Sequence, residues 1–84
     1  MMNKAMQIQI KYFAALREQV EKEEETVTTE SSTAAELYDE LQIKYHLTVP
    51  KENVGVAING QLRSLNFPLS TGDTIVYIPP VSGG

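Results

Sequence analysis

The chain has 84 residues, no cysteine and a formal net charge of −4 at pH 7. This length fits one small domain, the lack of cysteine excludes disulfides and thiolate metal sites, and the acidic balance disfavours electrostatic binding of nucleic acid. No apolar run is long enough to span a membrane, and the start lacks the apolar segment of a signal peptide, so we expect a cytoplasmic protein.

The first predicted strand is Gln7–Tyr12, in which polar and apolar residues alternate strictly. This period of two is typical of a strand with one buried face. The residues expected to face inward are Ile8, Ile10 and Tyr12. Phe13 breaks the rule, because by parity it falls on the polar face of the strand.

A second predicted strand is the β-branched segment Glu25–Thr29, which we expect to pair with the first strand as a hairpin. Residues 14–20, between the two strands, could hold a helical turn. The segment 18–25 is acidic, with Lys22 as its one basic residue. Its acidic members are Glu18, Glu21, Glu23, Glu24 and Glu25. Charge runs of this kind are usually solvated loops or helix ends, so we assign this one no chemistry.

The main predicted helix starts at a capping box, in which Thr33 caps free amides and Glu36 reaches back to the Thr33 amide. An apolar stripe with steps of three and four residues follows. The stripe consists of Ala34, Leu37, Tyr38, Leu41 and Tyr45. The helix should end near His46, and Ile43 lies off the stripe and should be partly exposed.

Three further strands complete the predicted sheet. Val54–Ile58 alternates again, Asn59-Gly60 supplies the positive φ angles of a tight hairpin turn, and Gln61–Arg63 returns as a short strand. Thr74–Ile78 is the last strand, and Pro79-Pro80 end it because proline has no amide to donate to a ladder. The order β-β-α-β-β-β predicts an α+β domain with a mixed sheet packed on one main helix.

The reactive groups of the chain do not predict an ordinary enzyme site. His46 has no companion at metal-ligand spacing, and no glycine-rich phosphate loop follows a strand. We interpret Ser31 and Ser32 as residues that cap the helix, and Asp39 and Glu40 form no convincing acid-base pair. We therefore expect no metal site and no cofactor bound by the fold.

The segment that remains is Val81–Gly84, which ends in two residues without a Cβ. The two prolines before it stiffen the exit from the sheet, and four extended residues reach about 13 Å. Such a segment can thread a narrow slot in another protein and present its terminal carboxylate there. Composition alone leaves a disordered end equally open.

Four stretches of the chain resemble one known family. They are YFAALRE (Tyr12–Glu18), VAINGQL (Val56–Leu62), PLSTGDTIVYIPP (Pro68–Pro80) and VSGG (Val81–Gly84). In this order and at this chain length they resemble the small subunits of molybdopterin synthase, which are sulfur carriers with the ubiquitin-like β-grasp fold. The chain departs from the family at Ile78, where phenylalanine is frequent, and in a few extra residues at its start.

The resemblance implies a β-grasp domain in residues 1–80 and a flexible Gly-Gly tail in residues 81–84. It implies that a partner adenylates the Gly84 carboxylate and that sulfur transfer leaves a thiocarboxylate, a 1-thioglycine, at this residue. The chain would then be the non-catalytic, sulfur-carrying subunit of the synthase. The tail residues that would enter the partner with it are Val81, Ser82 and Gly83.

The implied partners are the large synthase subunit, in a heterotetramer, and an activating enzyme with adenylyltransferase and sulfurtransferase activity. Neither nucleic acid nor a membrane is expected as a partner. The face of the sheet away from the helix is expected to dock onto the partners, because exposed apolar clusters usually mark interfaces. The residues expected on it are Phe13, Leu62, Val76 and Ile78. Arg17 matches a family arginine and is expected near the base of the tail or at the interface.

Other interpretations stay open. Some of the expected face residues could lie under the acidic segment instead of facing a partner. A sulfur carrier for thiamin thiazole formation or tRNA thiolation would share the fold and the Gly-Gly end, although YFAALRE and PPVSGG favour the molybdopterin branch. A ubiquitin-like modifier would be joined through Gly84 to lysines of other proteins, and a plain interaction module would carry an inert tail.

Overall fold

The computed structural model describes residues 5–80 of the chain. Its strands are β1 (Met6–Tyr12), β2 (Glu24–Thr29), β3 (Gly55–Ile58), β4 (Gln61–Arg63) and β5 (Thr74–Ile78). Its helices are α1 (Ala14–Val20), α2 (Ala34–Tyr45) and the 3₁₀ turn η1 (Lys51–Asn53). All predicted strands are present with bounds shifted by no more than one residue. The segment expected to hold a helical turn forms the helix α1, and η1 was not predicted.

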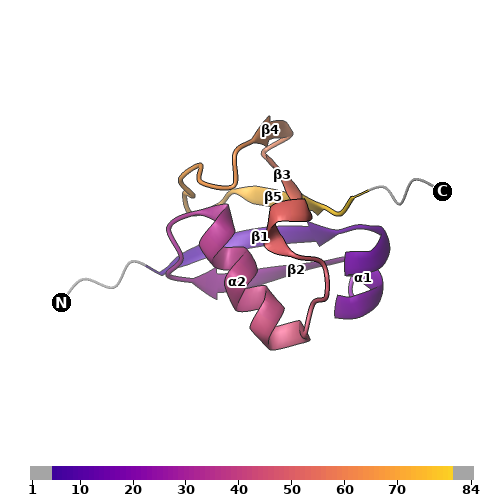
Figure 1. The fold of residues 1–84 in the computed structure, drawn as a ribbon. Coiled ribbons are helices and arrows are strands. Elements are labelled where there is room, and N and C mark those ends of the chain that lie inside the picture. Colours follow the sequence, from indigo (N-terminus) through magenta and orange to yellow (C-terminus); the bar gives the residue numbers. More distant parts are fainter. Residues whose placement is uncertain (1–4, 81–84) are drawn as a thin grey trace.

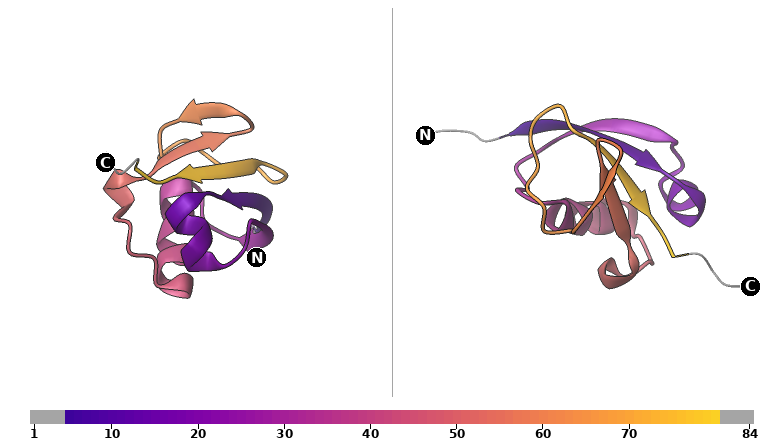
Figure 2. Two further views of the ribbon diagram at one scale, coloured as in Figure 1. Left: turned by 90° about the vertical axis from the view of Figure 1, so that its right-hand side faces the viewer. Right: turned by 90° about the horizontal axis from the view of Figure 1, so that it is seen from above.

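The strands form one mixed sheet in the order β2-β1-β5-β3-β4 (Figure 1). β1 and β5 run parallel, and the other neighbouring strands are antiparallel. The long helix α2 packs across one face of the curved sheet, while α1 lies beyond the end of β1 (Figure 1 and Figure 2). A mixed sheet wrapped around one main helix is the β-grasp architecture, so the predicted α+β fold class is confirmed.

The core lies between α2 and the covered face of the sheet. In β1, β3 and β5 every second residue is buried, and the apolar stripe of α2 packs against these residues. The largest fully buried side chains are Tyr12, Tyr38, Tyr77, Ile8, Ile10, Leu16, Leu37, Ile75 and Val56. Burying a hydroxyl is costly unless it is hydrogen-bonded. The Tyr77 hydroxyl donates to the Ala34 carbonyl at 2.8 Å, and the Tyr38 hydroxyl donates to the Val49 carbonyl at 2.7 Å.

The start of α2 agrees with the predicted capping box except in one hydrogen bond. The Thr33 hydroxyl accepts from the Glu36 amide at 3.2 Å, which makes Thr33 the N-cap residue. The Glu36 carboxylate accepts from the Ser32 amide at 2.8 Å, so the prediction that it reaches the Thr33 amide is wrong. Thr33 also forms an isolated bridge with Pro68, a tertiary pairing that sets the local path of the chain and that a local motif does not contain.

The predicted end of α2 and the predicted hairpin turn are both present. α2 ends at Tyr45, and His46 follows in the left-handed conformation with a φ of 56°, as a cap residue. In the hairpin between β3 and β4, Asn59 and Gly60 have φ angles of 54° and 85°. Ile43, which lies off the apolar stripe, is 79% exposed.

The predicted tail, Val81–Gly84, lies outside the described residues. Between residues 5 and 80, no helix combines the length and the apolar character needed to cross a membrane. In the same part of the chain, no three His, Cys, Asp or Glu side chains come together as a possible metal site.

Candidate functional site

The face of the sheet turned away from α2, which we call the open face, carries an apolar row across its strands. The register pairs Lys11 of β1 with Val76 of β5, Val76 with Ala57 of β3, and Ala57 with Leu62 of β4. Paired residues in adjacent strands project to the same face of a sheet. Val76, Ala57 and Leu62 therefore lie side by side on the open face, with a lysine at one end of the row.

A second apolar group lies near the end of β5. Ile78 pairs with Gly55, and the Cβ that glycine lacks would lie 3.9 Å from the Ile78 Cβ, so β3 leaves the Ile78 side chain uncovered. Phe13 follows β1 where α1 begins and lines the same hollow as Ile78. The exposed fraction is 77% for Leu62, 50% for Phe13 and 37% for Ile78. Phe13 and Leu62 are too exposed to lie beneath the acidic segment.

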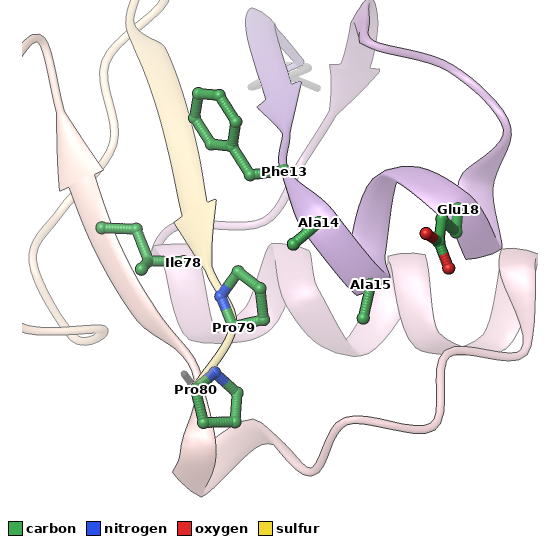
Figure 3. Close-up of a pocket in the computed structure, with 7 residues that line it drawn as sticks. All are labelled: Phe13, Ala14, Ala15, Glu18, Ile78, Pro79 and Pro80. Carbon is green, nitrogen blue, oxygen red and sulfur yellow. The ribbon is translucent and has the colours of Figure 1, made fainter. Parts of the chain in front are cut away.

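The chain leaves β5 beside an open hollow of about 630 Å³, which we call the exit hollow (Figure 3). It is lined by Phe13, Ala14, Ala15, Glu18, Ile78, Pro79 and Pro80. Glu18 is the one charged residue in this lining. The start of α1 forms one side of the hollow and the end of β5 with its two prolines forms the other (Figure 3). A segment that continues beyond Pro80 therefore starts beside an apolar surface.

The helix α1 is held from two directions. Leu16 and Val20 are buried under it. The Gln19 side chain makes two hydrogen bonds to Thr48: its amide nitrogen donates to the hydroxyl at 2.7 Å, and its oxygen accepts from the Thr48 backbone amide at 3.0 Å. The α1 side of the exit hollow is thus fixed to the core and to the loop after α2.

The corner between β1 and α1 has an unusual backbone. Phe13 is the extended N-cap residue of α1, and its carbonyl accepts from the Leu16 amide at 3.1 Å and the Arg17 amide at 3.3 Å. Ala14 has a φ of 51°. This left-handed conformation costs an alanine roughly 1–2 kcal/mol. Alanine is not typical of such a position, so no local signal in the sequence could have revealed it.

Arg17 does not line the exit hollow. It lines a smaller, charged hollow of about 250 Å³ with Lys11, Glu23 and Glu24. Phe13 lines both hollows and so lies between them. The residues that sequence reasoning missed at the exit, Ala14 and Ala15 above all, become visible only when α1 is packed beside the end of β5.

Glu25 departs from the predicted solvated acidic segment. Its carboxylate accepts from the Tyr12 hydroxyl at 2.6 Å, the Tyr45 hydroxyl at 2.8 Å and the Lys22 ammonium at 3.1 Å. Burial by itself raises the pKa of Glu25, but these hydrogen bonds outweigh burial and lower the pKa below its ordinary value. The prediction is wrong for this residue, because its two tyrosine partners come from β1 and α2 and are distant in the sequence.

Ser31 also differs from its prediction. It is buried, and its hydroxyl donates to the Glu40 carboxylate, which also accepts from the Thr29 hydroxyl at 2.6 Å. Ser31 therefore ties the end of β2 to the side of α2 and does not cap the helix. Asp39 forms an ion pair with Lys51 at 3.0 Å. Asp39 and Glu40 thus have separate structural partners.

The reactive end predicted at Gly84, with Val81, Ser82 and Gly83, lies outside the described residues. Comparison with known proteins covers this end as well: a family model described as the ThiS family matches residues 10–84. The molybdopterin synthase sulfur carrier subunit of Mycobacterium tuberculosis is 32% identical over 82 residues, which are 94% of this chain and 99% of that protein.

Two solved structures extend the comparison. One chain in the protein-protein complex of subunits 1 and 2 of the molybdopterin-converting factor from Helicobacter pylori is 31% identical, with a TM-score of 0.61 over 94% of this chain and 100% of that one. The small archaeal modifier protein 1 from Methanosarcina acetivorans is 23% identical, with a TM-score of 0.75 over 98% and 100% of the two chains. The latter likeness shows the shared fold.

Proposed function

The chain belongs to the ThiS family of ubiquitin-like sulfur carriers, and from this premise we propose that it is the sulfur-carrying small subunit of a molybdopterin synthase. The observation that carries the proposal is the 32% identity, along 94% of the chain, to the sulfur carrier subunit of the Mycobacterium tuberculosis synthase. The exit hollow and the open face support it, because they give the fold a partner surface next to the point where the chain leaves β5. A cytoplasmic location is part of the same proposal.

The chemistry of the proposed function takes place at Gly84. A carboxylate is a poor electrophile, so an activating enzyme first joins it to the adenylate of ATP and releases diphosphate. A sulfide-level sulfur then displaces AMP from the carbonyl carbon and leaves a thiocarboxylate, whose sulfur goes to the pterin precursor in the large subunit. The carrier supplies one reactive atom and its placement, while the catalytic groups belong to the partners.

The docking of this carrier uses the surfaces described above. The fixed φ angles of Pro79 and Pro80 direct the chain away from β5, and α1 is anchored beside them. Buried apolar anchors usually dominate an interface, while charged residues lie at its rim. We assign the anchor role to Phe13, Leu62, Val76 and Ile78, and the rim to Lys11, Arg17 and Glu18. The expected assembly contains two small and two large subunits.

The test is reconstitution of the intact chain with the activating enzyme, ATP and sulfide, followed by intact-mass measurement. We expect the mass change of one oxygen replaced by sulfur, located at Gly84 by fragmentation. A variant lacking Gly83 and Gly84 is the control. It should accept no sulfur but keep its melting temperature, because the core lies within residues 5–80. A fall of several degrees would contradict the view of the tail as a free arm.

A capture experiment from the native host separates the alternatives. Stoichiometric recovery of a molybdopterin synthase large subunit supports the proposed pathway. Recovery of thiazole or tRNA-thiolation enzymes instead would keep the carrier chemistry and overturn the pathway. Isopeptide bonds between Gly84 and lysines would identify a protein modifier, and full function of the truncated variant would identify an interaction module.

A further inference from the structure

Ala14 stands apart from the other non-glycine residues with positive φ. Glu21 and His46 are C-cap residues of α1 and α2, and Asn59 is in a tight hairpin turn, positions where the left-handed conformation is expected. Ala14 is instead the first residue of α1, where nothing in helix geometry requires a φ of 51°. Strained residues that a fold does not need are often retained for function.

The conformation of Ala14 determines how the exit hollow is built. A single residue turns the chain from the extended Phe13 into α1, so Phe13 stays beside β5 while the helix starts at once. The Ala14 methyl points toward Pro79 (Figure 3). Glycine would adopt this φ without strain but would leave the hollow without a methyl, and a long side chain would fill it. Alanine is therefore the residue that lines the hollow and keeps it open.

Because α1 is anchored, the backbone at Ala14 determines the angle between Phe13 and the helix. Leu16, Val20 and the Gln19–Thr48 hydrogen bonds hold the later part of the helix. Ala14 is exposed, and the first turn that contains it is held by the Phe13 carbonyl, which accepts hydrogen bonds from two amides of this turn. We propose that Ala14 is a positioning residue of the docking surface: its strained backbone sets the angle between Phe13 and α1, and its methyl packs against the large subunit. This role rests on the proposed function.

The test compares Ala14→Gly with His46→Gly, a matched change at another exposed residue of nearly equal φ, in the cap of α2. Denaturation midpoints and the affinity for the large subunit, measured by calorimetry, are recorded for both variants and the unchanged chain. Both variants should have a raised midpoint, because glycine relieves the left-handed strain. Only Ala14→Gly should bind more weakly, by about fourfold for the loss of one buried methyl.

An Ala14→Gly variant that binds as tightly as the unchanged chain, or that has a lower midpoint, overturns the role of Ala14. Ala14→Asn provides a second arm, because asparagine tolerates the left-handed conformation but places an amide in the hollow. It should bind more weakly than Ala14→Gly, and binding equal to the unchanged chain overturns the role as well. If the unchanged chain does not bind the large subunit, the proposed function itself fails, which is a separate outcome.

Discussion

The two faces of the sheet are made by the same strands but differ in what their side chains do. On β5, Ile75 and Tyr77 are fully buried beneath α2, while Ile78, on the open face, is 37% exposed. Within residues 5–80, every buried side-chain polar atom has a hydrogen-bond partner. The open face instead presents apolar side chains to solvent. The period of two along a strand thus separates the core residues from the residues proposed to bind a partner, and substitutions on the two faces should separate in the same way.

The largest expected effect on stability compares two residues of β5, one on each face of the sheet. Ile75→Ala should lower the free energy of unfolding by about 2–5 kcal/mol, because it opens a cavity in the core. Ile78→Ala should cost about 1 kcal/mol or less, because the side chain keeps much of its contact with water. Urea denaturation measures both, and the large subunit should bind Ile78→Ala more weakly. Equal losses of stability would mean that the open face is part of the core.

Glu25 is an exception to the comparison between the two faces, because it places a charged group on the covered face. The register pairs this residue with Ile10. Its pKa is lowered in the folded state, so its stabilising contribution is fully present above its ordinary pKa of 4.5 and is lost as the pH falls through the lowered value. The Glu25→Gln variant should be less stable than the unchanged chain at neutral pH. The two stabilities should converge in acid, as thermal denaturation across this range would measure.

The control for this experiment is Glu21→Gln, a change at an exposed acidic residue of the same segment. At neutral pH its stability should stay within about 0.5 kcal/mol of that of the unchanged chain, because the substitution is on the surface. Parallel curves for Glu25→Gln and the unchanged chain would show that the hydrogen bonds from Tyr12, Tyr45 and Lys22 do not favour the charged carboxylate. The acidic segment would then be as solvated as the sequence suggested.

The strands, the main helix and the hairpin were predictable because their signals are local. Alternation in Gln7–Tyr12, the Thr33 cap and the Asn59-Gly60 turn each act over a few residues. The open face followed from the same parity, since a residue next to a buried one in a strand faces the other way. Its use as a partner surface came from the family resemblance and stays a prediction.

The features that were missed depend on residues distant in the sequence. Glu25 meets Tyr45 across 20 positions, and Ser31 meets Glu40 across 9 positions, so a charge run alone could not reveal them. The exit hollow joins the start of α1 to the end of β5. Ala14 has a backbone conformation that its residue type disfavours, and this kind of misfit between local preference and structure is expected at functional sites.

The smallest expected effects on stability are those of two exposed residues. Their effects on binding test whether exposure or position defines the docking surface. Leu62 and Ile43 are 77% and 79% exposed, but Leu62 is on the open face and Ile43 is on α2. Both alanine variants should stay within about 0.5 kcal/mol of the unchanged chain in urea denaturation. Leu62→Ala should weaken binding to the large subunit by about tenfold, the loss expected for one buried leucine side chain, while Ile43→Ala should not change it. Equal losses of binding would mean that any exposed apolar side chain contributes to binding, wherever it lies on the surface. The open face would then not be the specific interface.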